Sequence, residues 1–232
     1  MTINSAATES RALQSKGASS EPIYAMVVTA LSSCRTAGGV LLDVGCGKGL
    51  LWSYIRNRFN QYVGADVVRH EGLPEDAIFH RIDLDSGRVP LADDFADVVV
   101  AVETIEHLEN PRAFARELTR LCKPGGWILI TTPNQVSILS KLTLLVKNSF
   151  NAFTDSSYPA HITALLELDL RRIATECGWQ DTTIRFTEDG RIPGTSRHWP
   201  RWISRRFPRA MSDNICLSGR KPQEYRIKRL TG

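Results

Sequence analysis

The chain has 232 residues, a hydrophobic fraction of 42% and a formal net charge of +4. This length and composition are those of one globular α/β domain with a sizeable core, and they exclude a chain too polar to fold. The mildly basic charge permits contact with an anionic surface but does not require a nucleic acid as substrate.

The N-terminal residues 1–20 are polar and rich in Ser, Ala and Thr, which predicts a disordered tail and no signal peptide. No apolar run is long enough to span a bilayer, and the five scattered cysteines form no C-x-x-C pair. These features predict a cytoplasmic location with reduced thiols. Apolar residues then recur at helical spacing over residues 22–34, which predicts the first helix.

A glycine-rich stretch comes next. The apolar run Val40 to Leu42 stops at Asp43, and glycines occupy positions 45, 47 and 49 before a run with helical spacing. This order predicts a strand, a tight turn and a helix. Glycine tolerates positive φ and lets a ligand lie against the backbone. In doubly wound sheets such a turn is where a nucleotide-like cofactor binds.

The spacing of the glycines decides between cofactors. A dinucleotide fingerprint is G-x-G-x-x-G, but Leu50 stands where its third glycine belongs. A phosphate-binding P-loop needs Ser or Thr after its lysine, but Lys48 is followed by Gly49. The pattern that remains is D-x-G-x-G-x-G, with Asp43 just before the turn.

The later elements alternate as in an α/β fold. Strands predicted over residues 62–66 and 78–84 carry acids near their ends, and Asp66 lies about 20 residues past the glycines, where an acid binds ribose hydroxyls. Further strands are predicted over residues 98–102, 127–131, 182–186 and 215–218, with helices from residue 110 and over 166–177. Residues 137–153 are amphipathic and residues 191–209 are rich in Arg and Trp. Packing on the domain itself and docking on a substrate or a membrane surface both remain open for these two segments.

Two carboxylates and an imidazole follow the fourth predicted strand, namely Glu103, Glu106 and His107. They fall at the carboxyl edge of the sheet, where ligands bind in open α/β folds. His161 supplies a second imidazole before the last helix. Such a set of oxygen and nitrogen ligands suits Mg, Mn, Fe or Zn.

The D-x-G-x-G-x-G stretch resembles the first motif of class I S-adenosylmethionine-dependent methyltransferases, particularly the type 11 and ubiquinone-biosynthesis O-methyltransferases. Residues 90–97 and the Pro-Gly-Gly break before the fifth strand resemble further signatures of that family. The resemblance implies a Rossmann-like fold with a seven-stranded mixed sheet flanked by helices and an antiparallel last strand. It implies one domain over residues 21–222, a lid-like insertion near 137–160 and a basic tail over 223–232.

The resemblance also implies the cofactor S-adenosyl-L-methionine. This cofactor carries an α-amino group and a sulfonium but no phosphate, so an acidic residue at the glycine turn suits it. In the family, acids at the positions of Asp66 and Asp83 bind the ribose and the adenine amino group, and the residue at Leu84 packs on the ring. The implied cofactor-binding residues are Asp43, Gly45, Cys46, Gly47, Gly49, Asp66, Asp83, Leu84 and Glu103.

The E-x-x-E-H pattern with a later His occurs in the ubiquinone-biosynthesis O-methyltransferases and in small-RNA 2'-O-methyltransferases. There the four residues bind a divalent metal that holds the acceptor hydroxyl, which implies that Glu103, Glu106, His107 and His161 are metal ligands here. The same E-H-L run occurs without metal in many small-molecule methyltransferases. The alternative is therefore that His107 acts as a metal-free base or orients the acceptor.

The expected function is transfer of a methyl group from S-adenosylmethionine to oxygen on a small molecule, a lipid-linked quinone precursor or a sugar. Residues 212–222 look similar to methyltransferases encoded with polysaccharide biosynthesis genes, which favours a sugar. The alternatives are a metal-dependent RNA 2'-O-methyltransferase and a non-catalytic S-adenosylmethionine-binding module. The amphipathic insertion, which contacts membrane in the ubiquinone enzymes, adds peripheral contact with the inner membrane face as an expectation.

Overall fold

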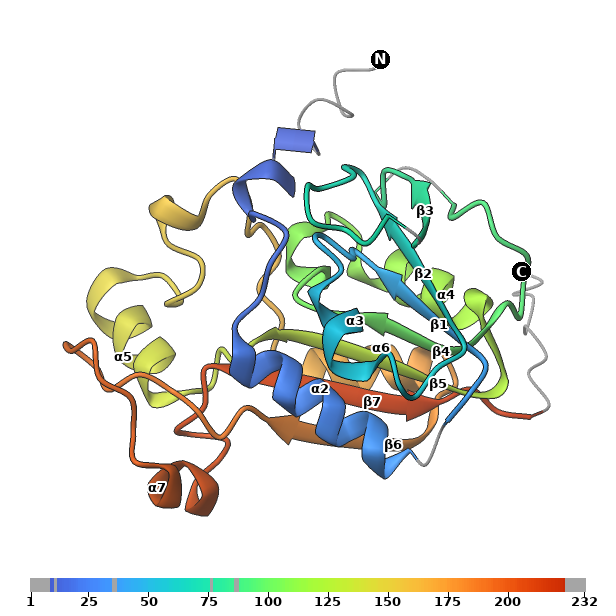
Figure 1. Ribbon diagram of the computed structural model, residues 1–232. Coiled ribbons are helices and arrows are strands. Elements are labelled where there is room, and N and C mark those ends of the chain that lie inside the picture. The colour runs from blue at the N-terminus through green and yellow to red at the C-terminus, as the bar shows by residue number, and fades with distance from the viewer. Residues whose placement is uncertain (1–8, 11, 35–36, 76, 86–87, 224–232) are drawn as a thin grey trace, which may run out of the picture.

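The computed structural model describes residues 9–10, 12–34, 37–75, 77–85 and 88–223 (Figure 1). Seven strands form one sheet in the order β3-β2-β1-β4-β5-β7-β6. β1 to β5 pair in parallel, whereas β7 runs antiparallel to both of its neighbours. The expected Rossmann-like mixed sheet is therefore confirmed. The strands are β1 (Val40–Val44), β2 (Gln61–Asp66), β3 (Ile78–Arg81), β4 (Ala96–Ala101), β5 (Cys122–Pro133), β6 (Gln180–Phe186) and β7 (Asn214–Arg220).

Helices cover both faces of the sheet (Figure 1). One face packs against α2 (Glu21–Ser33) and α3 (Leu50–Ile55), and the other against α4 (Pro111–Leu121) and α6 (Glu167–Glu176). Two further helices, α5 (Ile138–Lys147) and α7 (Arg201–Arg206), lie beside the sheet at the left of Figure 1. Single 3-10 turns are η1 (Ile105–His107) and η2 (Asp155–Ser157). None of the helices in the described ranges has the length and apolar character needed to cross a bilayer.

The central strand β4 explains the continuous apolar run in the sequence. Alternate residues of a strand point to opposite faces, so a strand covered on both faces is apolar throughout. Val98 and Val100 pack in the cluster with α2 and α3, while Val99 and Ala101 pack in the cluster with α4 and α6. All four side chains are fully buried. The strand whose carboxyl end carries Glu103 is thus fixed from both sides.

The fifth strand differs from the expectation. The Pro-Gly-Gly segment was expected to break the chain before the strand, but β5 begins at Cys122 and includes it. Gly125 has a φ of 77°, and its N–H donates to the carbonyl of Lys221 at 2.8 Å. The pairing of β4 with β5 shifts register between Ala96 and Val98. Proline and glycine therefore produce a bulge in the ladder and do not end it.

The N-terminal residues also differ from the expectation. Residues 1–8 and 11 lie outside the described residues, as does the expected basic tail beyond residue 223. Residues 12–20, which we call the N-terminal strap, make defined contacts where a disordered tail was expected: the Gly17 carbonyl accepts from the Lys48 N–H at 2.8 Å. Just before the strap, Glu9 forms an ion pair with Arg81 of β3. The folded unit therefore begins before the expected boundary at residue 21.

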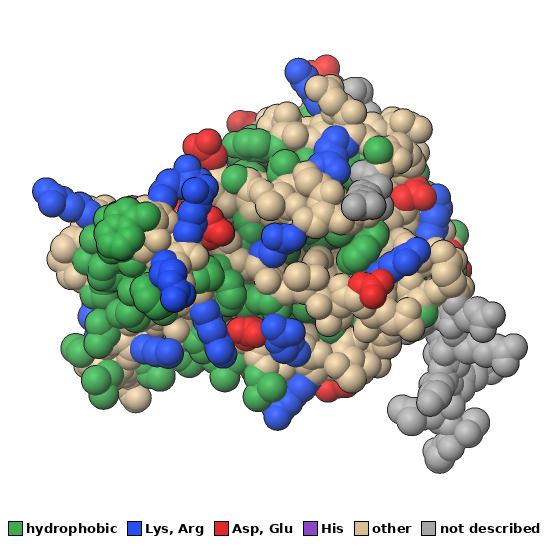
Figure 2. Space-filling view, turned by 90° about the horizontal axis from the view of Figure 1, so that it is seen from below, with side chains coloured by type: hydrophobic (Ala, Val, Ile, Leu, Met, Phe, Trp, Pro, Cys, Tyr) green, Lys and Arg blue, Asp and Glu red, His purple; other side chains and the backbone are tan. Residues whose placement is uncertain are grey.

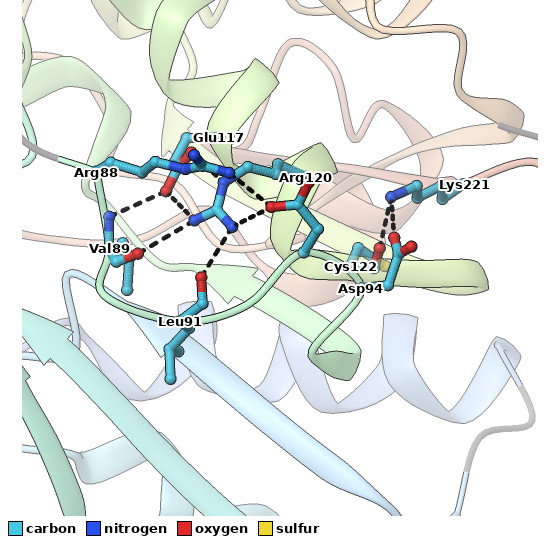
Figure 3. A network of polar contacts seen from close by, with 9 residues as sticks. Arg88, Val89, Leu91, Asp94, Glu117, Arg120, Cys122 and Lys221 are labelled. Carbon is cyan, nitrogen blue, oxygen red and sulfur yellow. Dashed lines mark hydrogen bonds and ion pairs between the residues drawn. The ribbon is translucent and has the colours of Figure 1, made fainter. Parts of the chain in front are cut away.

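A polar network fastens the loop that leads into β4 (Figure 3). The guanidinium of Arg120 pairs with Glu117 at 2.6 Å and with Asp93 at 2.8 Å, and it also donates to the carbonyls of Val89 and Leu91. Because one planar group bridges the loop and α4, the start of β4 is held against that helix. Beside this network, Lys221 after β7 donates to Asp94 Oδ1 at 2.6 Å and to the Cys122 carbonyl at 2.8 Å.

The position of Lys221 generates a stability prediction. Its side chain is 3% exposed, whereas that of Lys123, paired with Asp97 at 2.8 Å, is 41% exposed. Lys221→Met should lower the free energy of unfolding by about 2 kcal/mol, because it leaves a buried carbonyl and a carboxylate without their donor. The matched control Lys123→Met should lose less than about 1 kcal/mol. Urea titration followed by circular dichroism measures both, and equal losses would contradict the structural importance of Lys221.

Candidate active site

A cavity of about 320 Å³ opens at the carboxyl edge of the parallel strands. The loop after β1, the end of β2 and the end of β4 form its floor, and the N-terminal strap forms one wall. His107 and His161 lie in the wall of the same cavity. The glycine stretch and the imidazoles, which are far apart in the sequence, therefore face one space.

The glycine loop lies so close to neighbouring residues that a side chain at Gly45 or Gly47 would not fit. Gly45 and Gly47 have φ values of 80° and 51°, which favour glycine. A methyl group at Gly45 would overlap Thr104, and one at Gly47 would overlap the backbone of Gly17. Gly49 (φ 66°) is the N-cap of α3 and does not line the cavity. The first two glycines thus let the backbone form the cavity wall, and the third makes the turn into the helix.

Asp43 is buried at the end of β1, with 2% of its surface exposed. Its Oδ2 accepts a hydrogen bond from the Tyr62 hydroxyl at 2.9 Å, whereas its Oδ1 has no partner among the described residues. Burial raises the pKa of Asp43 to about 7, against the effect of the Tyr62 hydrogen bond, and the charge of Asp66 raises it further. Asp43 lines the cavity. A buried carboxylate with one unpartnered oxygen fits a cationic group such as the α-ammonium of S-adenosylmethionine.

Asp66 lies in the cavity wall and also supports the loop. Its Oδ2 accepts from the Gly47 N–H at 2.8 Å, and its Oδ1 accepts from the Val67 N–H at 2.7 Å. Burial raises the pKa of Asp66, and these two hydrogen bonds work in the opposite direction. A carboxylate can accept further hydrogen bonds on its remaining lone pairs, so both contacts are compatible with a ligand hydroxyl at the same group.

The other expected cofactor residues divide into two groups. Cys46, Leu84 and Glu103 line the cavity together with the residues above. Asp83 does not; it lies past the end of β3, and its Oδ1 accepts from the Asp85 N–H at 3.0 Å. The expected contact between this side chain and adenine is thus not part of the cavity wall.

The strap supplies lining residues that the sequence reading did not identify. Ala12, Ser15 and residues 17–20 face the cavity, and Tyr24 of α2 lies beside them. Two of the contacts that hold the strap use its backbone: the Gly17 carbonyl accepts from the Lys48 N–H, and the Ser19 N–H donates to the Tyr24 hydroxyl at 3.0 Å. A third comes from a side chain, because Gln14 Nε2 donates to the Tyr158 carbonyl at 3.2 Å. Backbone contacts leave no side-chain pattern, so the sequence carries no strong signal for this wall.

The side chain of Glu103 points in a direction that its position in the E-x-x-E-H pattern does not predict. Its φ is 50°, and its carboxylate accepts from the Thr131 hydroxyl at 2.8 Å and from Asn214 Nδ2 at 2.6 Å. Burial and the neighbouring Glu106 raise its pKa well above the ordinary value. Glu103 is thus tied to β5 and β7.

The structure groups the other three expected metal ligands. Ligand atoms of Glu106, His107 and His161 lie within 4.8 Å of one another, and Glu103 is not in this group. The Nδ1–H of His107 donates to the Ala160 carbonyl at 2.7 Å, and the Nδ1–H of His161 donates to the Ala152 carbonyl at 2.7 Å. In the neutral form of each ring, Nε2 then carries the lone pair, which is the arrangement found in metal-ligating histidines.

Glu106 completes the group as a buried acid. It is fully buried, and neither carboxylate oxygen has a hydrogen-bond partner among the described residues. Burial raises its pKa to about 8. Burial and the proximity of His107 lower the pKa of His161, so its imidazole is neutral at neutral pH. Two imidazoles beside an unpartnered carboxyl fit a divalent cation of the imidazole-binding kind.

Comparison with known proteins agrees with this geometry. A methyltransferase domain model matches residues 22–184. A probable S-adenosylmethionine-dependent methyltransferase of Mycolicibacterium smegmatis is 29% identical over 185 residues, which cover 77% of this chain and 67% of that protein. A ubiquinone biosynthesis O-methyltransferase of Chromobacterium violaceum is 31% identical over 110 residues, which cover 43% of this chain and 46% of that enzyme. The match thus spans less than half the length of that enzyme.

A solved structure supports the fold. The crystal structure of an S-adenosylmethionine-dependent methyltransferase from Archaeoglobus fulgidus superposes with a TM-score of 0.65 at 18% sequence identity, covering 90% of this chain and 97% of that chain. The family model spans most of the chain, and the glycine loop and Asp43 line the cavity. The chain belongs to the methyltransferase domain family and is an S-adenosylmethionine-dependent methyltransferase.

Proposed function

We propose that this enzyme methylates a hydroxyl group of a small acceptor that is held at Glu106, His107 and His161. The observation that carries the proposal is the single cavity that joins the glycine loop to both imidazoles. Several relatives are named ubiquinone biosynthesis O-methyltransferases, which supports an oxygen acceptor. The sulfonium is already an activated methyl donor, so the chain's own task is to align the acceptor and remove its proton.

The cofactor end of the cavity has defined roles in this proposal. Asp43 Oδ1 accepts from the α-ammonium, Asp66 accepts from the ribose hydroxyls, and Leu84 packs beside the adenine. The backbone of Gly45 and Gly47 supports the cofactor because no side chain intervenes there. These roles use the groups that line the cavity and leave Asp83 out.

At the acceptor end, Glu106, His107 and His161 bind a divalent cation in this proposal. Two imidazole nitrogens and one carboxylate suit Fe, Mn or Zn better than Mg. A cation held by these residues would supply a Lewis acid, which would lower the pKa of the acceptor hydroxyl. Without it, His107 Nε2 would remove the proton alone. Glu106 favours the cation over His107 acting alone. A cation would bind the unpartnered oxygens of Glu106, whereas proton removal by His107 alone would leave them without a partner.

The metal proposal predicts the behaviour of His161→Ala. Elemental analysis should find one tightly held divalent ion in the native enzyme and a loss of at least about tenfold in metal occupancy in the variant. Methylation of a panel of phenols and sugars should fall by at least about tenfold, while the affinity for S-adenosylhomocysteine stays unchanged. His80→Ala on β3 is the matched control and should behave as the native enzyme.

Other outcomes separate the alternatives. Full activity in the presence of a chelator, combined with an inactive His107→Ala variant, would contradict the metal and leave His107 as the base. Salt-dependent RNA binding with methylation of RNA and of no small acceptor would contradict the acceptor class. Cofactor binding with no turnover on any acceptor would favour the non-catalytic module.

The Asp43 role predicts opposite changes in binding and stability. In the folded protein burial raises the pKa of Asp43 to about 7 from 3.8, so the stability it contributes is complete below pH 4 and is lost as the pH rises through 7. Asp43→Asn should therefore stabilise the ligand-free protein at pH 8, by on the order of 2 kcal/mol, and have little effect at pH 4. Affinity for S-adenosylhomocysteine should fall by at least about tenfold.

Thermal unfolding at the two pH values and calorimetry measure these effects. The control is Asp97→Asn, because Asp97 accepts from the Val40 N–H and from Lys123. That variant should lose stability at pH 8 and keep its cofactor affinity. An Asp43→Asn variant that binds S-adenosylhomocysteine as tightly as the native enzyme would contradict the assigned role.

We also propose that α5 and α7 form a surface that rests on an anionic membrane. Leu145 and Val146 of α5 are 81% and 78% exposed, and Trp202 of α7 is 74% exposed. The two segments are joined where the Ile138 N–H donates to the Ala210 carbonyl at 2.8 Å. Figure 2 shows hydrophobic side chains gathered at this end of the molecule among Lys and Arg.

The charges around this surface favour anionic lipid. Lys141, Lys147 and Arg201 form no ion pair within the described part of the chain, and Arg206 lies over the Phe207 ring. Exposed apolar side chains among unpaired cations match the interface of a bilayer with negative headgroups. Such contact would bring a lipid-linked acceptor to the cavity from the membrane.

The double variant Leu145→Ser, Val146→Ser should bind phosphatidylglycerol vesicles at least about threefold more weakly in flotation assays, because less apolar area enters the interface. Raised salt should weaken native binding as well. Leu168→Ser removes an exposed leucine (52%) from α6 and should leave vesicle binding unchanged. Native protein that fails to float with anionic vesicles would contradict the membrane contact.

A further inference from the structure

Tyr62 lies beneath the glycine loop in a fixed position. It belongs to β2, is 5% exposed, and directs its hydroxyl to Asp43 Oδ2 at 2.9 Å. Its ring packs on Trp52 of α3, with ring centroids 5.3 Å apart and planes inclined by 30°. A strand and a helix therefore hold this hydroxyl from two sides.

The hydrogen bond determines how the Asp43 carboxylate is oriented. Rotation of a carboxylate about its last side-chain bond is only weakly restricted by itself. Because Tyr62 engages Oδ2, the carboxylate of Asp43 is held in one orientation, and Oδ1 is left buried without a partner among the described residues. Asp43 itself is one of the residues that line the cavity. The acceptor for a cationic group is thus set in place before the ligand arrives.

Tyr62 and Asp66 also have opposite effects on the pKa of Asp43. The titratable groups that face Asp43 are Tyr62 and Asp66 of β2, Cys46 of the loop and Tyr24 of α2, and all are neutral or acidic. Asp66 raises the pKa of Asp43, whereas the Tyr62 hydrogen bond lowers it. Burial raises the pKa of Tyr62 itself, so its hydroxyl remains a donor at every working pH.

We propose that Tyr62 is a positioning residue for the cofactor, acting through Asp43 to orient and keep ionised the oxygen that receives the α-ammonium. The inference rests on the proposed role of Asp43. It assigns Tyr62 no contact with the cofactor, so the effect of removing its hydroxyl is confined to ligands that carry the ammonium group.

Two ligands and one conservative substitution test this inference. S-adenosylhomocysteine carries the amino acid moiety, whereas 5'-methylthioadenosine has the same nucleoside without it. Tyr62→Phe should weaken binding of S-adenosylhomocysteine about tenfold at pH 7 by calorimetry, because a hydrogen bond to a charged group is lost. Binding of 5'-methylthioadenosine should change less than about twofold. The pH below which S-adenosylhomocysteine affinity declines should move upward in the variant.

Control variants separate positioning from damage to the fold. Tyr54→Phe removes a hydroxyl from the tyrosine that stacks on Tyr24 and should leave both ligands unaffected. In an Asp43→Asn background, Tyr62→Phe should add less than a twofold change, because its route of action is gone. Equal weakening of both ligands, or unchanged binding of both, would overturn the inference.

The same measurements distinguish a failure of the Tyr62 role from a failure of the Asp43 role. If Asp43→Asn loses S-adenosylhomocysteine while Tyr62→Phe retains native affinity, the role of Asp43 stands and that of Tyr62 fails. If Asp43→Asn binds normally, the proposed role of Asp43 fails, and the Tyr62 inference fails with it.

Discussion

The cavity depends on a carboxylate that the fold buries with only half of its hydrogen-bonding capacity used. Asp43 is the last residue but one of the apolar β1 strand, and it is buried there, so its charge cannot move towards solvent. Burying a carboxylate is unfavourable unless hydrogen bonds or an opposite charge compensate for it. Tyr62 provides one hydrogen bond, and a cationic ligand would provide the rest. The hydrogen bonds that Asp43 lacks thus lower the stability of the ligand-free protein, and they favour binding of a cationic ligand for the same reason.

The loop above this carboxylate is constrained by close contact. Gly45 lies against Thr104 from the end of β4, and Gly47 lies against Gly17 from the strap. Asp66 holds Gly47 from the end of β2. Segments that are distant in the sequence therefore fix one short turn, which gives the cavity a defined wall. The strap is part of this arrangement, so it belongs to the domain in a physical sense.

The predictable features are those that local patterns encode. The strand, turn and helix around Asp43 follow from an apolar run, alternate glycines and helical spacing, and Asp66 follows from its distance to that turn. The strap could not be predicted, because Gly17 and Ser19 contribute backbone atoms and carry no side-chain signature. The family resemblance implied that Asp83 binds adenine, but β3 ends at Arg81 and Asp83 is not among the residues that line the cavity.

Glu103 shows the limit of spacing as a guide. The E-x-x-E-H pattern places two acids near one another in the chain, but a left-handed backbone at Glu103 turns its side chain towards Thr131 and Asn214. Asn214 lies 111 residues away, so only the sheet order that sets β7 beside β5 brings it there. Glu103 consequently lines the cavity between the glycine loop and the group of Glu106, His107 and His161.

Three acids thus line the cavity, Asp43, Asp66 and Glu103, and the fully buried Glu106 lies beside it, next to His107 and His161. Burial raises the pKa of each, so each carboxyl favours any change that adds positive charge nearby. In the proposed reaction, loss of the methyl group removes the sulfonium charge from the cofactor, and that one positive charge leaves the cavity with the proton of the acceptor hydroxyl. Loss of this charge weakens the attraction between the acids and the cofactor, which favours departure of the products over that of the substrates.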